Sequence, residues 1–445
     1  MGEGETAPLE TINSMIYYVH ALVFPALVAV AAQGPSSGDL AAQRHRERGV
    51  ELHMKGEHAK AAAEFGEAIR LNPADAIAHY NRATSWSEVP DYDKALADYD
   101  KAIELDPKLA SAFLGRGRVR AAIGETDQAI TDYDRALAID PNDPLTHFAK
   151  AQANAGRGRF AEALPDYDRA IRLDPSRALP HLSRGDAHRA LGDYDKALND
   201  LNRAIRLNPK LADAFHARGT VWFERGRHFE AVDDFSEAIR LDPNDSRAYV
   251  GRGAARFELH DFDPAIADYD QAIRLNPRSA SAYYGRARTL AQLGDYDTAA
   301  ADYDKALALN PQFADAVSGR GIVRLLQGRD QEAATDLDAA LRLAPDNAVA
   351  ATHRARILAA SPDDSLRNGA AALELAERAR SLTGDGEFHA LEALAAALAE
   401  LGRFDQAVAQ QTKALALAES HEDRAKAQAR LDLYQQRKPL RDARP

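Results

Sequence analysis

The chain has 445 residues and a formal net charge of −12, from 68 acidic and 56 basic side chains. This balance disfavours general binding to nucleic acid or to anionic lipid, because both need a basic surface. Cysteine is absent, which excludes disulfides, thiolate metal sites and cysteine nucleophiles.

Residues 1–41 contain an apolar signal-like or anchor segment followed by a linker. No Asp, Glu, Lys or Arg stands between Glu10 and Asp39, and residues 15–32 are strongly apolar. The segment ends at Ala29–Ala32, which resembles the small-residue cleavage site of a secretory signal. The residues ahead of it are acidic, however, where a signal peptide is normally basic.

Three interpretations of this segment remain open. Export with cleavage near Ala31 or Ala32 is the one we favour, and it makes the protein periplasmic or secreted. An uncleaved membrane anchor through residues 15–32 is the second, because about 18 apolar residues can just span a bilayer. Arg44 and its basic neighbours would then favour repeats on the cytoplasmic side. A packed or disordered leader on a cytoplasmic protein is the third.

One constant period governs the chain from residue 42 to residue 347. Prolines recur at the same interval without a slip, at Pro73, Pro107, Pro141, Pro175, Pro209, Pro243, Pro277, Pro311 and Pro345. A fixed period of this length indicates an array of similar stacked units instead of one conventional globular core.

Other rows in the same register predict tightly packed helix pairs. Alanine stands at positions −12 and −5 relative to each proline, Gly or Ala stands at −24, and a large apolar residue stands at −8, as in Tyr133 and Leu201. Glycine inside a helix is unfavourable by roughly 1 kcal/mol relative to alanine, so its recurrence indicates a backbone contact too close for a larger side chain. Asn-Pro or Asp-Pro ends most second helices, and Gly-Asp-Tyr or a variant, as at Gly192, ends most first helices.

This pattern resembles the tetratricopeptide repeat family, whose helix–turn–helix unit has about 34 residues. One copy carries the matching residues Gly185, Gly192, Tyr194, Ala197, Leu201, Ala204 and Pro209. The resemblance covers nine repeats over residues 42–347. It implies an all-α fold, a right-handed α-solenoid (superhelix) of helix–turn–helix repeats, and binding of a protein or peptide on the concave side, lined by the first helix of each repeat.

The register becomes irregular after Pro345. Residues 348–421 form two divergent repeats with an insertion, because the interval from Ala355 to its counterpart Ala395 is longer than the regular period. Residues 422–445 form a C-terminal capping helix and tail. This region resembles a closing unit of bacterial multi-repeat proteins, and a cap is needed because the last repeat would otherwise expose an apolar face.

Two charged rows share the period. A basic row comprises Arg48, Arg82, Arg116, Lys150, Arg184, Arg218, Arg252, Arg286, Arg320 and Arg354, and an acidic row comprises Glu64, Asp98, Asp132, Asp166, Asp200, Asp234, Asp268, Asp302 and Asp336. We predict a ladder of ion pairs between first and second helices, with most separations within about 5 Å. The alternative is an arginine spine that binds an acidic partner.

No pattern indicates an enzyme, a cofactor site or a metal site. Glycine pairs such as Gly115 and Gly117 lack the third glycine and the preceding strand of a nucleotide-binding loop. His45, His79, His147 and His181 share one repeat position with Phe113, Phe215, Tyr249 and Tyr283, which indicates packing residues at helix ends. Neither a zinc spacing nor a catalytic pair stands out.

The groove lined by the first helices is therefore the candidate binding site. Its predicted partner-binding residues are Tyr80, Leu114, Arg118, Phe148, Gln152, Leu182, Arg189, His216, Phe223, Phe257, Tyr284 and Arg288. This apolar and aromatic mixture suits an extended or helical partner segment. We expect a non-enzymatic interaction scaffold in a bacterial envelope; the alternative is a cytosolic or membrane-tethered regulatory or adaptor subunit of an enzyme complex.

Overall fold

A computed structural model describes residues 37–384 and 386–441, and over these ranges the chain forms helices and turns without a strand. The apolar segment 15–32 lies outside the described residues, so the predictions of export or anchoring stay predictions. Among the helices described, none is long and apolar enough to cross a membrane. Contacts divide the chain into two units, residues 1–221 and 222–445, and each is treated by itself.

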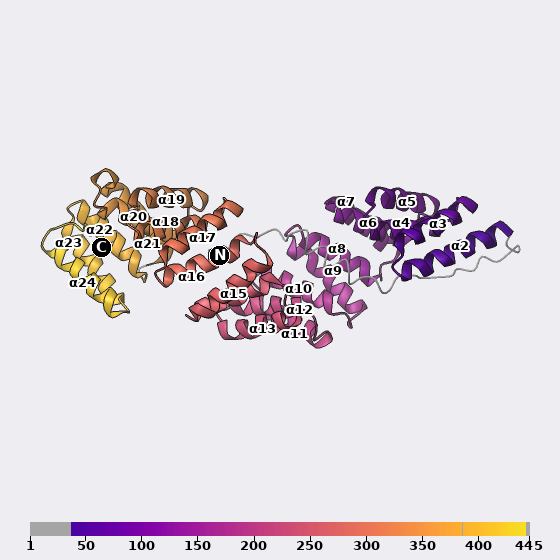
Figure 1. Ribbon diagram of the computed structural model, residues 1–445, viewed down its shortest axis with the longest axis horizontal. Helices are drawn as coiled ribbons and strands as arrows, with labels where there is room; N and C mark the ends of the chain where they lie inside the picture. The colour runs from indigo at the N-terminus through magenta and orange to yellow at the C-terminus, as the bar shows by residue number, and fades with distance from the viewer. Residues whose placement is uncertain (1–36, 385, 442–445) are drawn as a thin grey trace. The chain divides into compact units, whose positions relative to one another are not determined.

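The first unit consists of antiparallel helix pairs with the predicted spacing (Figure 1). Its helices are α2 (Ser37–Met54), α3 (His58–Leu71), α4 (Ala76–Glu88), α5 (Tyr92–Leu105), α6 (Ala110–Ala122), α7 (Thr126–Ile139), α8 (Pro144–Ala155), α9 (Phe160–Leu173), α10 (Ala178–Ala190) and α11 (Tyr194–Leu207), and α12 (Ala212–Glu224) contains the unit boundary. Even-numbered helices are the first helix of each pair.

The second unit continues the same alternation. Its helices are α13 (His228–Leu241), α14 (Ser246–Glu258), α15 (Phe262–Leu275), α16 (Ala280–Gln292), α17 (Tyr296–Leu309), α18 (Ala314–Leu326), α19 (Asp330–Leu343), α20 (Ala348–Ala360), α21 (Gly369–Thr383), α22 (Phe388–Glu400), α23 (Phe404–Leu417) and α24 (His421–Gln435). A short 3₁₀ helix, η2 (Asp364–Leu366), lies between α20 and α21, where the regular spacing is interrupted.

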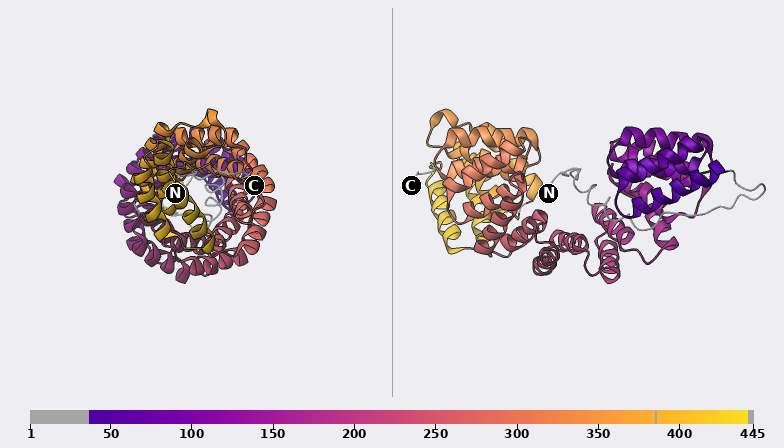
Figure 2. Two further views of the ribbon diagram at one scale, coloured as in Figure 1. Left: turned by 90° about the vertical axis from the view of Figure 1, so that its left-hand side faces the viewer. Right: turned by 45° about the vertical axis from the view of Figure 1, so that its right-hand side comes forward.

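Within each unit the first helices form one layer and the second helices another, and Figure 2 shows the stacked pairs. The strongest contacts between alternate helices join first helices, such as α4 with α6 and α14 with α16. Since the first helices approach one another in this way, each stack curves toward them. The first helices therefore form the inner layer of each unit.

The core consists of the small and large rows that the period predicts. The alanines of both rows are almost completely buried, and so are the large apolar residues from Phe65 to Leu337. A Cβ atom added to Gly117 would lie 2.5 Å from Cε1 of Tyr133. Glycine is needed there mainly because of the Tyr133 ring, and the predicted backbone contact is also present, since the carbonyl oxygen of Ala129 lies 3.2 Å from the same Cβ position.

The predicted helix ends are also confirmed. Gly192 and Gly294 have φ angles of 79° and 85°, a left-handed conformation that glycine adopts without steric cost. The side chain of Asp295 then accepts a hydrogen bond from the backbone N–H of Thr298. At the other end of a pair, Asn72 before Pro73 is extended, with φ −137° and ψ 88°, as proline requires of its predecessor.

Candidate partner-binding site on the inner helices

The predicted ladder of ion pairs is confirmed. Its shortest nitrogen–oxygen distances are Arg48–Glu64 3.3 Å, Arg82–Asp98 2.7 Å, Arg116–Asp132 2.6 Å, Lys150–Asp166 3.6 Å, Arg184–Asp200 2.6 Å, Arg252–Asp268 2.7 Å, Arg286–Asp302 2.7 Å and Arg320–Asp336 2.7 Å. These cations neutralise carboxylates of the fold, which disfavours the alternative of an arginine spine for an acidic partner.

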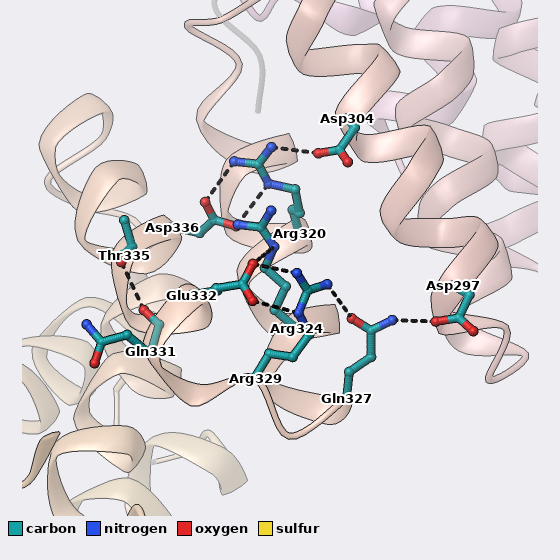
Figure 3. A network of polar contacts seen from close by, with 10 residues as sticks. All are labelled: Asp297, Asp304, Arg320, Arg324, Gln327, Arg329, Gln331, Glu332, Thr335 and Asp336. Atoms are coloured by element: carbon teal, nitrogen blue, oxygen red, sulfur yellow. Dashed lines mark hydrogen bonds and ion pairs between the residues drawn. The ribbon is translucent and has the colours of Figure 1, made fainter. Parts of the chain in front are cut away.

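A second set of carboxylates, from the preceding second helix, completes the ladder. Arg320 on α18 lies between Asp336 of α19 and Asp304 of α17, both at 2.7 Å (Figure 3). The same connection to the preceding repeat is made by Arg116–Asp100, Lys150–Asp134, Arg184–Asp168, Arg286–Asp270 and Arg354–Asp338. The ladder therefore links neighbouring repeats as well as the two helices of one repeat.

The shared histidine and aromatic position also serves the ladder. His79 Nδ1 lies 3.2 Å from Asp98 Oδ1, and His181 Nδ1 lies 3.3 Å from Asp200 Oδ1. Burial alone would raise the pKa of the Asp98 carboxyl, but hydrogen bonds from His79 and Arg82 outweigh it and lower that pKa. Where an aromatic residue replaces histidine, it stacks on the ladder arginine, as Tyr283 does at 5.8 Å from Arg286. Packing at the helix end was predicted for this position, and its polar role was not.

The residues predicted to contact a partner lie on the inner helices at different depths. Leu114, Phe148 and Leu182 are buried, with exposed fractions of 6%, 7% and 3%, so they present little surface to a ligand. Tyr80, Arg118, Gln152, Arg189, His216, Phe223, Phe257 and Tyr284 are half-buried, and Arg288 is exposed. Partner binding by these residues stays a prediction.

Three of the predicted positions in the second unit form an aromatic and charged cluster with their neighbours. Cζ of Arg288 on α16 lies 4.0 Å from the ring centre of Phe257 on α14, and Nη1 of Arg288 lies 3.1 Å from Glu258 Oε1. The ring of Tyr284 is 4.8 Å from that of Phe313. Arg288 is thus held between an aromatic face and a carboxylate.

Arg118 on α6 differs from Arg288 and from the ladder cations. Within residues 37–384 and 386–441 its guanidinium forms no hydrogen bond and no ion pair. Its charge acts on nearby phenols: burial raises the pKa of Tyr80, and the charge of Arg118 opposes this effect. The same opposition acts on Tyr99 and Tyr133. A half-buried cation among tyrosines is a composition typical of binding hot spots.

The last repeats contain a small cavity with both polar and apolar walls, which the repeat pattern does not predict. It measures about 20 Å³, room for one water molecule, and is lined by Thr352, His353, Arg356, His389, Glu392, Ala393, Ala396, Arg430 and Leu440. Burial lowers the pKa of His353 to about 4, and its Nδ1 atom is buried without a hydrogen-bond partner among the described residues. Glu392 pairs with Arg430.

No group of three or more metal-ligating side chains occurs among the residues that the structure describes. The arrangement supports recognition through side-chain contacts along a line of inner helices. The side chains available for such contacts are aromatic rings, the guanidinium of Arg118 on α6, and acidic and basic groups in the last repeats.

Comparison with curated proteins yields no match. Among solved structures, the chain is similar to the hetero-tetramer Cut9–Hcn1 of the APC/C, with 15% identity, 88% of this chain and 96% of that chain covered, and a TM-score of 0.52. The structure of yeast Tom70 matches with 17% sequence identity, covers 90% of this chain and 97% of that chain, and has a TM-score of 0.42. YrrB, described as a TPR protein with an unusual peptide-binding site, matches with 28% sequence identity. The match covers 41% of this chain and 95% of that chain, with a TM-score of 0.37.

Family models identify the repeats directly. Models described as tetratricopeptide repeat match residues 182–246, 250–312 and 286–348, residues 144–177 and residues 388–421, and a model described as TPR repeat matches residues 91–124 and 117–158. Together they cover more than half of the chain, and the Cut9–Hcn1 likeness agrees with the same fold. The chain belongs to the tetratricopeptide repeat family.

Proposed function

We propose that this protein is a non-enzymatic interaction scaffold that binds a segment of a protein partner along its inner helices. The observation that carries this proposal is Arg118, a half-buried cation that pairs with no carboxylate in the part of the chain that the structure describes. The ladder cations of the same fold pair with one or two. We infer that the partner segment supplies the missing anion, through an Asp or Glu side chain.

The physical argument is that a planar guanidinium can bind a carboxylate through two parallel hydrogen bonds. Tyr80 and Tyr99 lie close enough for the charge of Arg118 to influence their pKa values. Arg118 is half-buried, and an ion pair in a partly desolvated site is stronger than one in water. The general acidity of the chain does not oppose this, because binding depends on the local charge at α6.

For location, we propose the bacterial envelope, with the apolar segment 15–32 removed on export. The alternative is a cytosolic or membrane-tethered regulatory or adaptor subunit, which would keep that segment. Sequencing the N-terminus of the protein from its native cells decides between them. A terminus just after Ala31 or Ala32 supports export, and an intact leader contradicts it.

Site-specific cross-linking tests the binding surface. Ala121 stands on α6 at the repeat position that Arg189 and Phe223 occupy in other repeats, and it is half-buried. A photo-reactive amino acid at Ala121 should cross-link the partner in native fractions. The same group at Arg135, an exposed residue of the second helix α7, should not.

Charge reversal at the two arginines provides the matched control. Arg118→Glu should abolish the cross-link at position 121, because it would repel an acidic segment. Arg135→Glu changes the net charge equally but lies on the outer layer, and it should leave the cross-link unchanged. Equal effects of the two variants would contradict the proposed site.

A further inference from the structure

We propose that the inner surface formed by α20, α22 and α24 is a second binding surface, for an extended segment in which an aliphatic residue precedes a basic one. In this structure the chain's own residues 438–441 occupy it. This proposal rests on the proposed function, because it assumes that the inner helices bind partner segments. A partner segment of the same chemistry would displace residues 438–441. We call residues 438–441 the tail.

The chain reverses direction immediately after α24. Arg437 has a φ angle of 59°, a left-handed backbone conformation that residues other than glycine rarely adopt. The N–H groups of Arg437 and Lys438 donate to the carbonyl oxygens of Tyr434 and Leu433, each at 3.0 Å. This hydrogen-bonded end turns the tail back toward the inner helices instead of continuing away from them.

Two side chains of the tail contact the inner surface. Leu440 packs against the apolar core cluster of the last repeats and forms part of the cavity wall beside Ala393 and Ala396. Nη1 of Arg441 lies 2.7 Å from Glu400 Oε2 at the end of α22. Glu400 is also 3.3 Å from Nε of Arg367, so its carboxylate connects the tail to the loop before α21.

The tail covers repeat positions that we predict to contact a partner on the preceding first helices. Thr352 and Arg356 on α20 stand two repeats after Tyr284 and Arg288, at the same places in the register. On α22 the corresponding residues face the same cavity. The tail therefore lies where a bound segment of a partner would lie on the preceding first helices.

The packing under Leu440 argues against a dedicated structural plug. Leu440 lines a cavity of about 20 Å³ that it does not fill, and the wall of this cavity also contains the polar side chains of His353 and Glu392. Protein cores are normally close-packed. An occupant that leaves such a gap is suited to replacement by a segment that fits better.

Binding of a synthetic peptide tests the surface directly. The probe is a fluorescent peptide with the sequence of residues 436–441, Gln-Arg-Lys-Pro-Leu-Arg, and its anisotropy is measured with the full-length protein. In the wild-type chain the covalent tail competes at a high effective concentration. The double variant Leu440→Asp with Arg441→Glu should therefore bind the probe about tenfold more tightly, and Glu400→Lys in that background should reverse the gain.

A milder variant keeps the test meaningful if the double variant loses structure. Arg441→Glu removes only a partly exposed side chain, 40% accessible, and should also increase probe affinity while thermal unfolding stays unchanged. Equal affinity of the wild type and both folded variants, or no binding to any of them, would show that the tail is only a cap. Because Arg118 is in the other unit, failure of the cross-linking experiment would not alter this peptide readout.

Discussion

The regular repeats and the closing region α20–α24 solve the same packing problem with different chemistry. In the regular repeats, a basic residue such as Arg286 links the carboxylates of two second helices, at 2.6 Å from Asp270 and 2.7 Å from Asp302. In the closing region this ladder ends. Arg354 contacts Asp338 of the preceding repeat, and its Nη1 atom is buried without a partner among the described residues. On α22 the corresponding position is Leu394.

The difference shows how position in the array decides the interaction. Inside the array every repeat has a neighbour on both sides, so buried charges can be paired in the same way each time. In the closing region α22 packs against α20, α21 and α23, and it is buried continuously from Ala390 to Ala399. Apolar burial stabilises this packing without the geometric match that each buried ion pair needs.

The largest expected loss of unfolding free energy distinguishes a ladder arginine of the regular repeats from the arginine at the same repeat position in the closing region. Arg286→Ala leaves the carboxylate of Asp302, which is 5% exposed, without a cation and should destabilise the protein by about 3–5 kcal/mol. Arg354→Ala leaves only Asp338, whose side chain is 43% exposed, and should have a much smaller effect. Urea unfolding followed by circular dichroism measures both. Equal losses would mean that the ladder does not distinguish the two regions.

The closing region should respond to pH where the ladder does not. Burial lowers the pKa of His353 to about 4, below its ordinary value of about 6.5. Between these values the unfolded chain binds a proton that the folded chain does not, so stability falls as pH falls from 6.5 to 4, by up to about 3 kcal/mol.

His353→Leu should reduce this slope, as measured by unfolding free energies across the same range, and the part due to His188, whose pKa burial also lowers, should remain. The ladder carboxylates lose their contribution only at a lower pH. The pKa values of Asp98 and Asp200 are lowered, so their contribution is present above about pH 4 and is lost below it. An unchanged slope between pH 6.5 and 4 in the variant without His353 would assign the slope to other groups.

Glycine positions sharpen the comparison at the level of packing. A Cβ atom on Gly115 would lie 2.5 Å from Cε1 and Cζ of the buried Tyr99, so Gly115→Ala should destabilise by about 1–3 kcal/mol. On α3, a Cβ atom on Gly66 would meet nothing closer than 3.6 Å among the described residues. Gly66→Ala should therefore stabilise by about 0.5–1 kcal/mol through helix propensity. Melting temperatures that shift in the same direction would contradict this account.

Much of the fold follows from the period, because backbone contacts that recur in every repeat select the same small or large residue each time. The alanine rows, the aromatic row and the ion pairs within each repeat are of this kind. The ion pairs to the preceding repeat were not predicted, because the row that supplies their carboxylates mixes Asp100 and Asp304 with Gly66, Asn202 and Ser236. A row that tolerates substitution gives no clear signal in a single sequence.

The depth of the candidate site residues could not be predicted from the sequence, for a geometric reason. Repeat position indicates which face of a helix a residue occupies, but not how closely the next first helix covers it. Leu114, Phe148 and Leu182 are buried for this reason. The contact of Leu440 with α22 depends on a chain reversal at Arg437, and nothing in a periodic pattern predicts a left-handed arginine.

The smallest expected change in stability distinguishes a binding residue from a structural one. Arg118 has no ion pair or hydrogen bond within the described residues, so Arg118→Ala should change the unfolding free energy by no more than about 0.5 kcal/mol. Arg135→Ala, which removes an exposed arginine from the outer layer, should behave in the same way, and thermal and urea unfolding measure both. A loss at Arg118 comparable with that at Arg286 would mean that Arg118 stabilises the fold through the surrounding tyrosines. Its role in recognition would then need other support, because a cation on which the fold depends is less available to a partner.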